Sequence, residues 1–214
     1  MSAPLPKTEA KRLKILWEYE VLDTVPEAVF DDLTELAARI CEAPIALISL
    51  VDEDRQWFKS KVGISLSETS RDVSFCAYAI LGKEPLLVPD ATKDKRFAQN
   101  PLVVSAPKLR FYAGAPLITP DGQALGSLCV MDSVPRTLRA DQKQALIILA
   151  RHVMTQLELR HRSRELAVAH VANTAAGGEL KKARMEISRL RKKLVGLKTK
   201  PKTAAGKAPR KKSR

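Results

Sequence analysis

Cys76 has the most suggestive surroundings of the side chains that could do chemistry. It follows Ser74, whose hydroxyl predicts a helix N-cap, so that Cys76 lies in the first turn of a short helix over residues 75–81. Free N–H groups and the helix dipole at such a position favour the reactive thiolate. The alternative is a small buried hydrophobic side chain, which is the role we expect for Cys41 and Cys129.

A second group of residues combines aromatic surface with charge and could line a ligand pocket, although its charges could equally form surface ion pairs. Its members are Phe75, Cys76, Asp90, Arg96, Phe97, Arg110 and Tyr112. His152, His161 and His170 are spaced by about two and a half helical turns, so that neighbours point to opposite faces and predict no metal site. The sequence contains no glycine-rich phosphate loop, and we expect no cofactor.

The charge of the 214-residue chain is concentrated at one end. The net charge of +13 arises in residues 161–214, which hold 17 Lys and Arg against 3 Asp and Glu, whereas residues 1–160 hold 20 against 21. Three cysteines at wide spacing argue against a disulfide framework, and the chain has no apolar leader or membrane-length apolar run. We therefore expect a cytoplasmic protein with one neutral domain and a basic extension.

Hydrophobic periodicity predicts the elements that would position these residues. Residues 8–19 form a short amphipathic helix, and Thr24 with Glu27 forms a capping box for a helix that ends before Pro44. A buried strand (44–51), a half-exposed or edge strand (56–62), a loop (65–73), a short strand (86–88), a capped helical turn (90–97) and an irregular connection from Asn100 follow in that order. Two apolar runs, 111–118 and 124–131, flank Pro120-Asp121-Gly122 and predict a β-hairpin.

The C-terminal third is helical and then polar. We expect a helix from residue 142 to about 176, interrupted by Gly177-Gly178, and a short coiled coil that pairs with a second copy. Its apolar positions are Leu180, Ala183, Ile187, Leu190, Leu194 and Leu197. Residues 198–214 predict a disordered tail able to bind polyanions weakly through Lys198, Lys200, Lys202, Lys207, Arg210, Lys211, Lys212 and Arg214. A solubilising tail, or a dock for an acidic partner or anionic membrane, is equally compatible with this composition.

A series of short motifs runs through the middle two thirds of the chain. They are Leu-Asp-Thr at 22–24, Phe-Asp-Asp-Leu at 30–33, the strand with Asp at 44–52, Arg-Gln-Trp-Phe-Lys-Ser at 55–60, Glu-Thr-Ser-Arg at 68–71, Ser-Phe-Cys-Ala at 74–77, Arg-Phe at 96–97, Asn-Pro at 100–101, Arg-Phe-Tyr-Ala-Gly-Ala-Pro-Leu at 110–117, Leu-Gly at 125–126, Cys-Val-Met-Asp at 129–132 and Pro-Arg at 135–136. Through these motifs, residues 22–160 resemble a GAF domain of the kind attached to bacterial sensor kinases and diguanylate cyclases. The resemblance implies an α+β fold with a six-stranded antiparallel sheet, a pocket on the face opposite the terminal helices, and a role in sensing small molecules or in dimerisation. Most such relatives signal through the C-terminal helix to a kinase or cyclase.

The resemblance also frames two alternatives. Some GAF-fold proteins are free methionine sulfoxide reductases that use several cysteines, but residues 102–107, where another would be needed, contain none. Tetrapyrrole attachment uses a Cys-His pair, whereas Ala77 follows Cys76.

We therefore expect a non-catalytic sensory module that forms a homodimer. We expect no catalytic output domain after residue 160, and the resemblance then implies action on an unidentified signalling protein in trans. The predicted segments are an N-terminal helix (1–21), the GAF domain (22–160), a helical extension with the coil (161–197) and the tail (198–214). A redox enzyme or thiol sensor based on Cys76, and a non-specific nucleic-acid-binding protein based on the tail, remain alternatives.

Overall fold

The computed structural model describes residues 2–198, with side chains described up to residue 193. The chain divides into two compact units, residues 1–163 and residues 164–214. The first unit is an α+β domain built on one antiparallel sheet, and the described part of the second is helical. In the part of the chain that is described, no helix combines the length and apolar character needed to cross a membrane.

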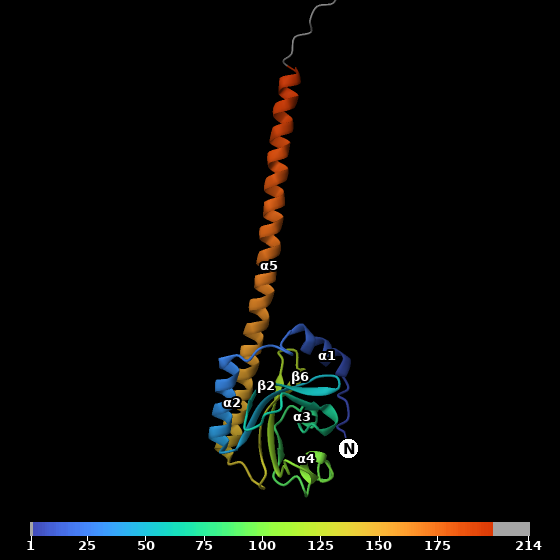
Figure 1. Cartoon of the computed structure of the whole chain (residues 1–214), viewed down its shortest axis with the longest axis vertical. Helices are drawn as coiled ribbons and strands as arrows, with labels where there is room; N and C mark the ends of the chain where they lie inside the picture. The colour runs from blue at the N-terminus through green and yellow to red at the C-terminus, as the bar shows by residue number, and fades with distance from the viewer. Residues whose placement is uncertain (1, 199–214) are drawn as a thin grey trace, which may run out of the picture. The chain divides into compact units, whose positions relative to one another are not determined.

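The sheet of the first unit has six strands, all paired in antiparallel fashion, in the order β3-β2-β1-β6-β5-β4 (Figure 1). The predicted hairpin is confirmed, and Gly122 turns it with a φ of 82°. The buried strand predicted over residues 44–51 is confirmed as the inner strand β1. The strand bounds are β1 Ile45–Val51, β2 Arg55–Val62, β3 Glu68–Ser70, β4 Leu86–Val88, β5 Phe111–Ile118 and β6 Ala124–Asp132.

Alternation along the strands divides the core into two layers. Ala46, Ile48 and Leu50 of β1 join the layer that includes buried residues of α1 (Glu9–Glu18), α2 (Ala28–Cys41) and the first turns of α5 (Ala140–Lys198). Leu47 of β1 joins the opposite layer. That layer is covered by the short helices α3 (Cys76–Ala79) and α4 (Pro101–Val104), while the 3-10 turn η1 (Arg71–Val73) follows β3.

Strand β2 is not the half-exposed or edge strand expected from its alternating pattern. It lies between β1 and β3, and residues 56–60 are all buried. The segment expected as a loop supplies the covering strand, because Glu68–Ser70 pairs with residues 55–57. Two polar side chains of β2, Gln56 and Lys59, are buried and hydrogen-bonded to partners within the domain.

Other boundary predictions were also wrong. The capping box at Thr24 does not form, since the Thr24 hydroxyl donates to the carbonyl of Val21 and helix α2 begins at Ala28. Residues 90–97 form turns that Asp90 and Asp94 cap, as expected, but they do not form a helix. Asn100 caps the short helix α4 within the segment expected to be irregular. Gly177 and Gly178 do not interrupt α5, because a glycine in a helix costs only about 1 kcal/mol relative to alanine.

Candidate ligand-binding cavity

A cavity of about 70 Å³ lies on the sheet face opposite α2 and α5. The sheet supplies its floor, and segments 64–76 and 102–109 supply its walls. None of the described residues that line it is charged. The lining residues are Ile45, Leu47, Gln56, Phe58, Ile64, Leu66, Thr69, Phe75, Cys76, Leu102, Pro107, Leu109, Tyr112 and Met131.

Three of the residues proposed from the sequence line this cavity: Phe75, Cys76 and Tyr112. Phe97 lies behind Phe75, with ring centroids 3.9 Å apart, and is fully buried. It therefore supports the wall and is not among the lining residues. Most of the lining was missed, because the alternation that carries Leu47 and Phe58 to this face does not distinguish a cavity wall from ordinary core.

The three predicted charged residues are engaged outside the lining. Arg96 forms an ion pair with Asp94, at 2.6 Å. Asp90 accepts hydrogen bonds from the backbone N–H and the hydroxyl of Thr92. Arg110 donates to the carbonyl oxygens of residues 103 and 109, and so holds together the segment that walls the cavity.

Cys76 is the first residue of α3. Ser74 caps this turn as predicted, because its hydroxyl accepts the backbone N–H of Ala77 at 3.0 Å. The Sγ atoms of Cys76 and Cys129 are 3.7 Å apart. The Tyr112 hydroxyl lies 3.4 Å from the Cys76 sulfur, to which it donates, and 3.2 Å from the Ser127 hydroxyl.

These contacts shift the two thiols in opposite directions. Hydrogen bonding with Cys129, Ser127 and Tyr112 lowers the pKa of Cys76 despite its burial. Hydrogen bonding with Cys76, together with burial, raises the pKa of Cys129. These side-chain contacts therefore favour negative charge on Cys76 over Cys129.

Gln56 is a polar group in the wall whose hydrogen-bonding capacity is used within the protein. Its side-chain carbonyl accepts from the hydroxyls of Ser74 and Ser49, and its amide donates to Thr69 at 2.7 Å. The described wall thus presents mainly apolar surface to a bound molecule.

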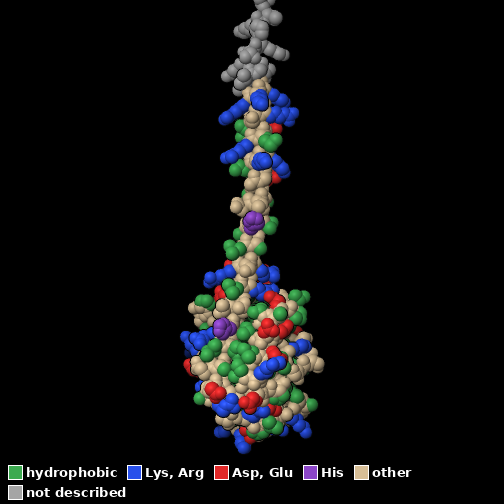
Figure 2. Space-filling view, turned by 90° about the vertical axis from the view of Figure 1, so that its left-hand side faces the viewer, with side chains coloured by type: hydrophobic (Ala, Val, Ile, Leu, Met, Phe, Trp, Pro, Cys, Tyr) green, Lys and Arg blue, Asp and Glu red, His purple; other side chains and the backbone are tan. Residues whose placement is uncertain are grey.

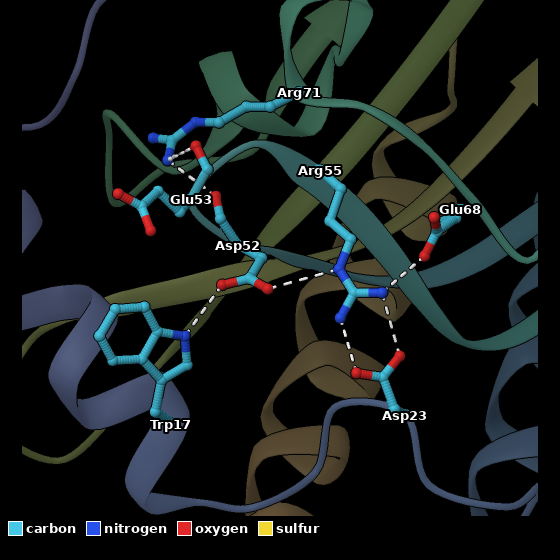
Figure 3. A network of polar contacts seen from close by, with 7 residues as sticks. All are labelled: Trp17, Asp23, Asp52, Glu53, Arg55, Glu68 and Arg71. Carbon is cyan, nitrogen blue, oxygen red and sulfur yellow. Dashed lines mark hydrogen bonds and ion pairs between the residues drawn. The ribbon is translucent and has the colours of Figure 1, made fainter.

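An ion-pair network fixes the strand that carries Thr69 (Figure 3). Arg55 binds Asp23 through two hydrogen bonds of 3.0 and 2.6 Å, and Glu68 through one of 2.6 Å. Asp52, beside Arg55, accepts the indole N–H of Trp17 at 2.9 Å. The network ties β3 and the start of β2 to α1 and to the segment that joins α1 to α2.

Arg71 extends this network toward α1. It donates to the carbonyl oxygens of Asp52 and Glu53 (Figure 3). It also forms an ion pair with Glu9 at 2.6 Å. Glu9 is also bound by Arg12 through two hydrogen bonds of 2.8 Å. Burial alone would raise the pKa of Glu9, but hydrogen bonds from Arg12 and Arg71 outweigh it and lower this pKa to about 2.

The second unit carries the predicted coil positions. Leu180, Ile187 and Leu190 are exposed along α5. Figure 2 shows hydrophobic and basic side chains interspersed along this helix. The side chains of Leu194, Leu197 and Lys198, and all of residues 199–214, lie outside the described part of the chain, so the polyanion-binding prediction stays a prediction. Among the described residues, no group of three His, Cys, Asp or Glu side chains could hold a metal ion.

Comparisons with known proteins agree with this architecture. The GAF domain family model matches residues 25–157. A cyclic di-GMP phosphodiesterase of Pseudomonas aeruginosa is 44% identical over 155 residues, which are 72% of this chain and 26% of that protein. The chain thus spans about a quarter of the length of this relative.

Solved structures share the fold at lower sequence identity. The GAF domain of a phosphoenolpyruvate-protein phosphotransferase from Acinetobacter superposes with a TM-score of 0.53 at 16% identity, covering 74% of this chain and 97% of that one. The corresponding domain from Coxiella burnetii gives a TM-score of 0.51 at 18% identity, over 74% of this chain and 98% of the other. The GAF domain of PixJ from Thermosynechococcus elongatus gives 0.53 at 15% identity, covering 66% and 90%.

Proposed function

The chain belongs to the GAF domain family, and we propose that it is a non-catalytic regulatory module whose cavity beneath α3 and α4 binds a small, uncharged, mainly apolar molecule. The observation that carries this proposal is the lining of the cavity, in which no described side chain is charged. A phosphate or carboxylate group bound there would lose its hydration without a cation to replace it, at a cost of several kcal/mol.

The volume limits the size of the ligand. An engineered cavity of about 150 Å³ binds benzene, whereas the cavity here measures about 70 Å³. The ligand therefore has few non-hydrogen atoms. The side-chain polar atoms of Gln56 and Tyr112 in the lining are hydrogen-bonded within the protein, which supports a binding role over a catalytic one.

Methyl NMR of the full chain tests the ligand class, with xenon as the small apolar probe and cyclic di-GMP as the charged one. We expect xenon to shift the methyl signals of Ile64, Leu66 and Leu102, which line the cavity, and to leave those of Leu146 and Leu149, in the opposite core, unchanged. Shifts of the first three methyl groups by cyclic di-GMP alone would overturn the proposal. Native mass spectrometry of protein purified from its own host would then identify a natural ligand by mass.

We further propose that the signalling partner acts in cyclic di-GMP turnover. Support comes from the relative that is 44% identical to this chain and is a cyclic di-GMP phosphodiesterase. The test compares the cyclic di-GMP content of host cells with and without this gene, and complementation with the gene is the control. An unchanged content would contradict a partner in cyclic di-GMP turnover.

We also propose that the module is a parallel homodimer joined through α5. The apolar spacing of three and four residues extends back from Leu190 to Leu166, and Asn173 occupies one core position. In a parallel pair in this register, Glu179 and Glu186 of one helix face Arg184 and Arg191 of the other, as g and e positions do. These complementary charges favour a second copy of this chain over an antiparallel or unrelated helix.

A further inference from the structure

Cys76 and Cys129 form a pair of buried thiols between α3 and β6. Their sulfur atoms are 3.7 Å apart, while a disulfide requires about 2.05 Å. The gap is therefore about 1.7 Å, and α3, which carries one of the two, is a single short turn packed on β5 and β6. In the ligand binding proposed above, Cys76 serves only as part of the cavity wall, and Cys129 has no part.

The two thiols differ in access. Cys76 is one of the residues that line the cavity, so a molecule of the size of hydrogen peroxide inside it would contact this residue. Cys129 is fully buried and is not among the lining residues. An oxidant entering from the cavity therefore reaches Cys76 first.

The surroundings also suit the chemistry. The Tyr112 hydroxyl donates to the Cys76 sulfur at 3.4 Å, which stabilises the negative charge of a thiolate. The lowered pKa of Cys76 and the raised pKa of Cys129 agree with a thiolate on the first and a thiol on the second. Cys41 offers an internal reference, because burial raises its pKa to about 11 and it lies in the opposite core layer.

We propose that Cys76 and Cys129 are a peroxide-responsive dithiol that closes to a disulfide within one chain. The Cys76 thiolate attacks the peroxide, so that an S–O bond forms as the O–O bond breaks; Cys76 becomes a sulfenic acid, and the peroxide is reduced and, once protonated, leaves as an alcohol or water. The Cys129 thiol then attacks the sulfenic sulfur, the S–S bond forms, and hydroxide leaves and takes the Cys129 proton as water. Two thiols and one hydroperoxide thus give one disulfide, one alcohol or water, and one water.

Hydrogen peroxide treatment of the reduced full-length protein tests this proposal, with alkylation of remaining thiols and peptide mapping. We expect a mass lower by two hydrogens, a cross-link between the peptides of Cys76 and Cys129, and Cys41 still alkylated. Cys76 should react at least about tenfold faster than Cys41, because the thiolate is the reactive form. A dithiol reductant should restore all three thiols.

Matched variants separate the steps. Cys129→Ser should accumulate a dimedone-reactive sulfenic acid at Cys76, Cys76→Ser should form none at Cys129, and Cys41→Ser should cross-link at the parental rate. If a variant fails to fold, the peptide map of the peroxide-treated protein without substitutions still tests the proposal. Equal oxidation of Cys41 and Cys76, a disulfide between two chains, or no reaction would each overturn the proposal, and none of these outcomes bears on ligand binding.

Discussion

Lys59 and Glu27 form an ion pair of 2.6 Å in which the lysine side chain is completely buried. The ammonium also donates to the hydroxyl of Thr24 and to the carbonyl of Val25. The same oxygen of Glu27 accepts from Arg160 of α5 at 3.0 Å. The Glu27 carboxylate therefore links α5 to strand β2. In this strand Phe58, the residue next to Lys59, lines the cavity.

This arrangement predicts unequal costs for removing the two partners. Glu27→Gln leaves Lys59 buried and Arg160 beside it without a counter-charge, which should lower the free energy of unfolding by about 3 kcal/mol. Lys59→Met leaves Glu27 paired with Arg160 and fills the same space with an apolar chain, so it should cost less than about 1.5 kcal/mol. Urea unfolding of both variants measures the difference.

The control for this comparison is Glu35→Gln. Glu35 pairs with Arg39 on the exposed face of α2, and we expect its loss to change the free energy of unfolding by no more than about 0.5 kcal/mol. If Lys59→Met were as unstable as Glu27→Gln, the lysine itself would stabilise the fold, and compensation of its buried charge by Glu27 would not explain the difference.

Glu9 predicts a contribution to acid sensitivity. Its pKa in the folded protein is lowered to about 2 from 4.5. A lowered pKa means that the carboxylate stabilises the fold fully above about pH 4.5, and that this stabilisation is lost as the pH falls toward 2. Glu9→Gln should therefore be less stable than the parent at pH 7, and its stability should fall less between pH 4.5 and pH 2.

Thermal unfolding between pH 4.5 and pH 2 shows whether Glu9→Gln loses less stability than the parent as the pH falls. Asp94→Asn is the matched control, since the pKa of Asp94 is lowered by hydrogen bonds from Arg96, which lies outside the α1 network. Identical slopes for the parent and Glu9→Gln would place the acid-sensitive contacts elsewhere.

Arg55 predicts a difference between arginine and lysine. Its guanidinium binds Asp23 with two hydrogen bonds while also reaching Glu68 (Figure 3). A lysine cannot reproduce this planar geometry, so Arg55→Lys should recover less than half of the stability lost in Arg55→Ala, which we expect to be about 1 to 3 kcal/mol. Hydrogen exchange should show faster opening of β3 in both variants, and full rescue by lysine would contradict the geometric explanation.

The sequence predicted the apolar inner strands of the sheet better than the strands nearer its edge. The apolar runs of β1, β5 and β6 are enough to predict inner strands, because a continuous run of apolar residues indicates a strand that is buried on both faces. Strand β2 was misjudged because Lys59 looked exposed, whereas its partners come from residues 24–27. A buried charge is recognisable only when its distant partners are known.

The candidate site shows the same limit. Phe75, Cys76 and Tyr112 were identified from residue type, and they do line the cavity. Arg96 and Arg110 were included for their charge, but Arg96 is paired with Asp94 and Arg110 donates to backbone carbonyls outside the lining. The contact between Cys76 and Cys129 joins residues 53 positions apart, and no local pattern indicates it.

The apolar register of α5 predicts the oligomeric state. Ile187 and Leu190 are exposed core positions of the proposed parallel pair, whereas Met185 is also exposed but lies on the opposite face of the same helix. Replacing Ile187 and Leu190 with glutamate would place charges inside the seam, and we expect a monomer by light scattering at concentrations where the parent is a dimer. Met185→Glu adds the same kind of charge outside the seam and should remain a dimer. A dimer that survives the double substitution would move the interface to residues 1–163, and a monomer in Met185→Glu would show that added negative charge alone prevents association.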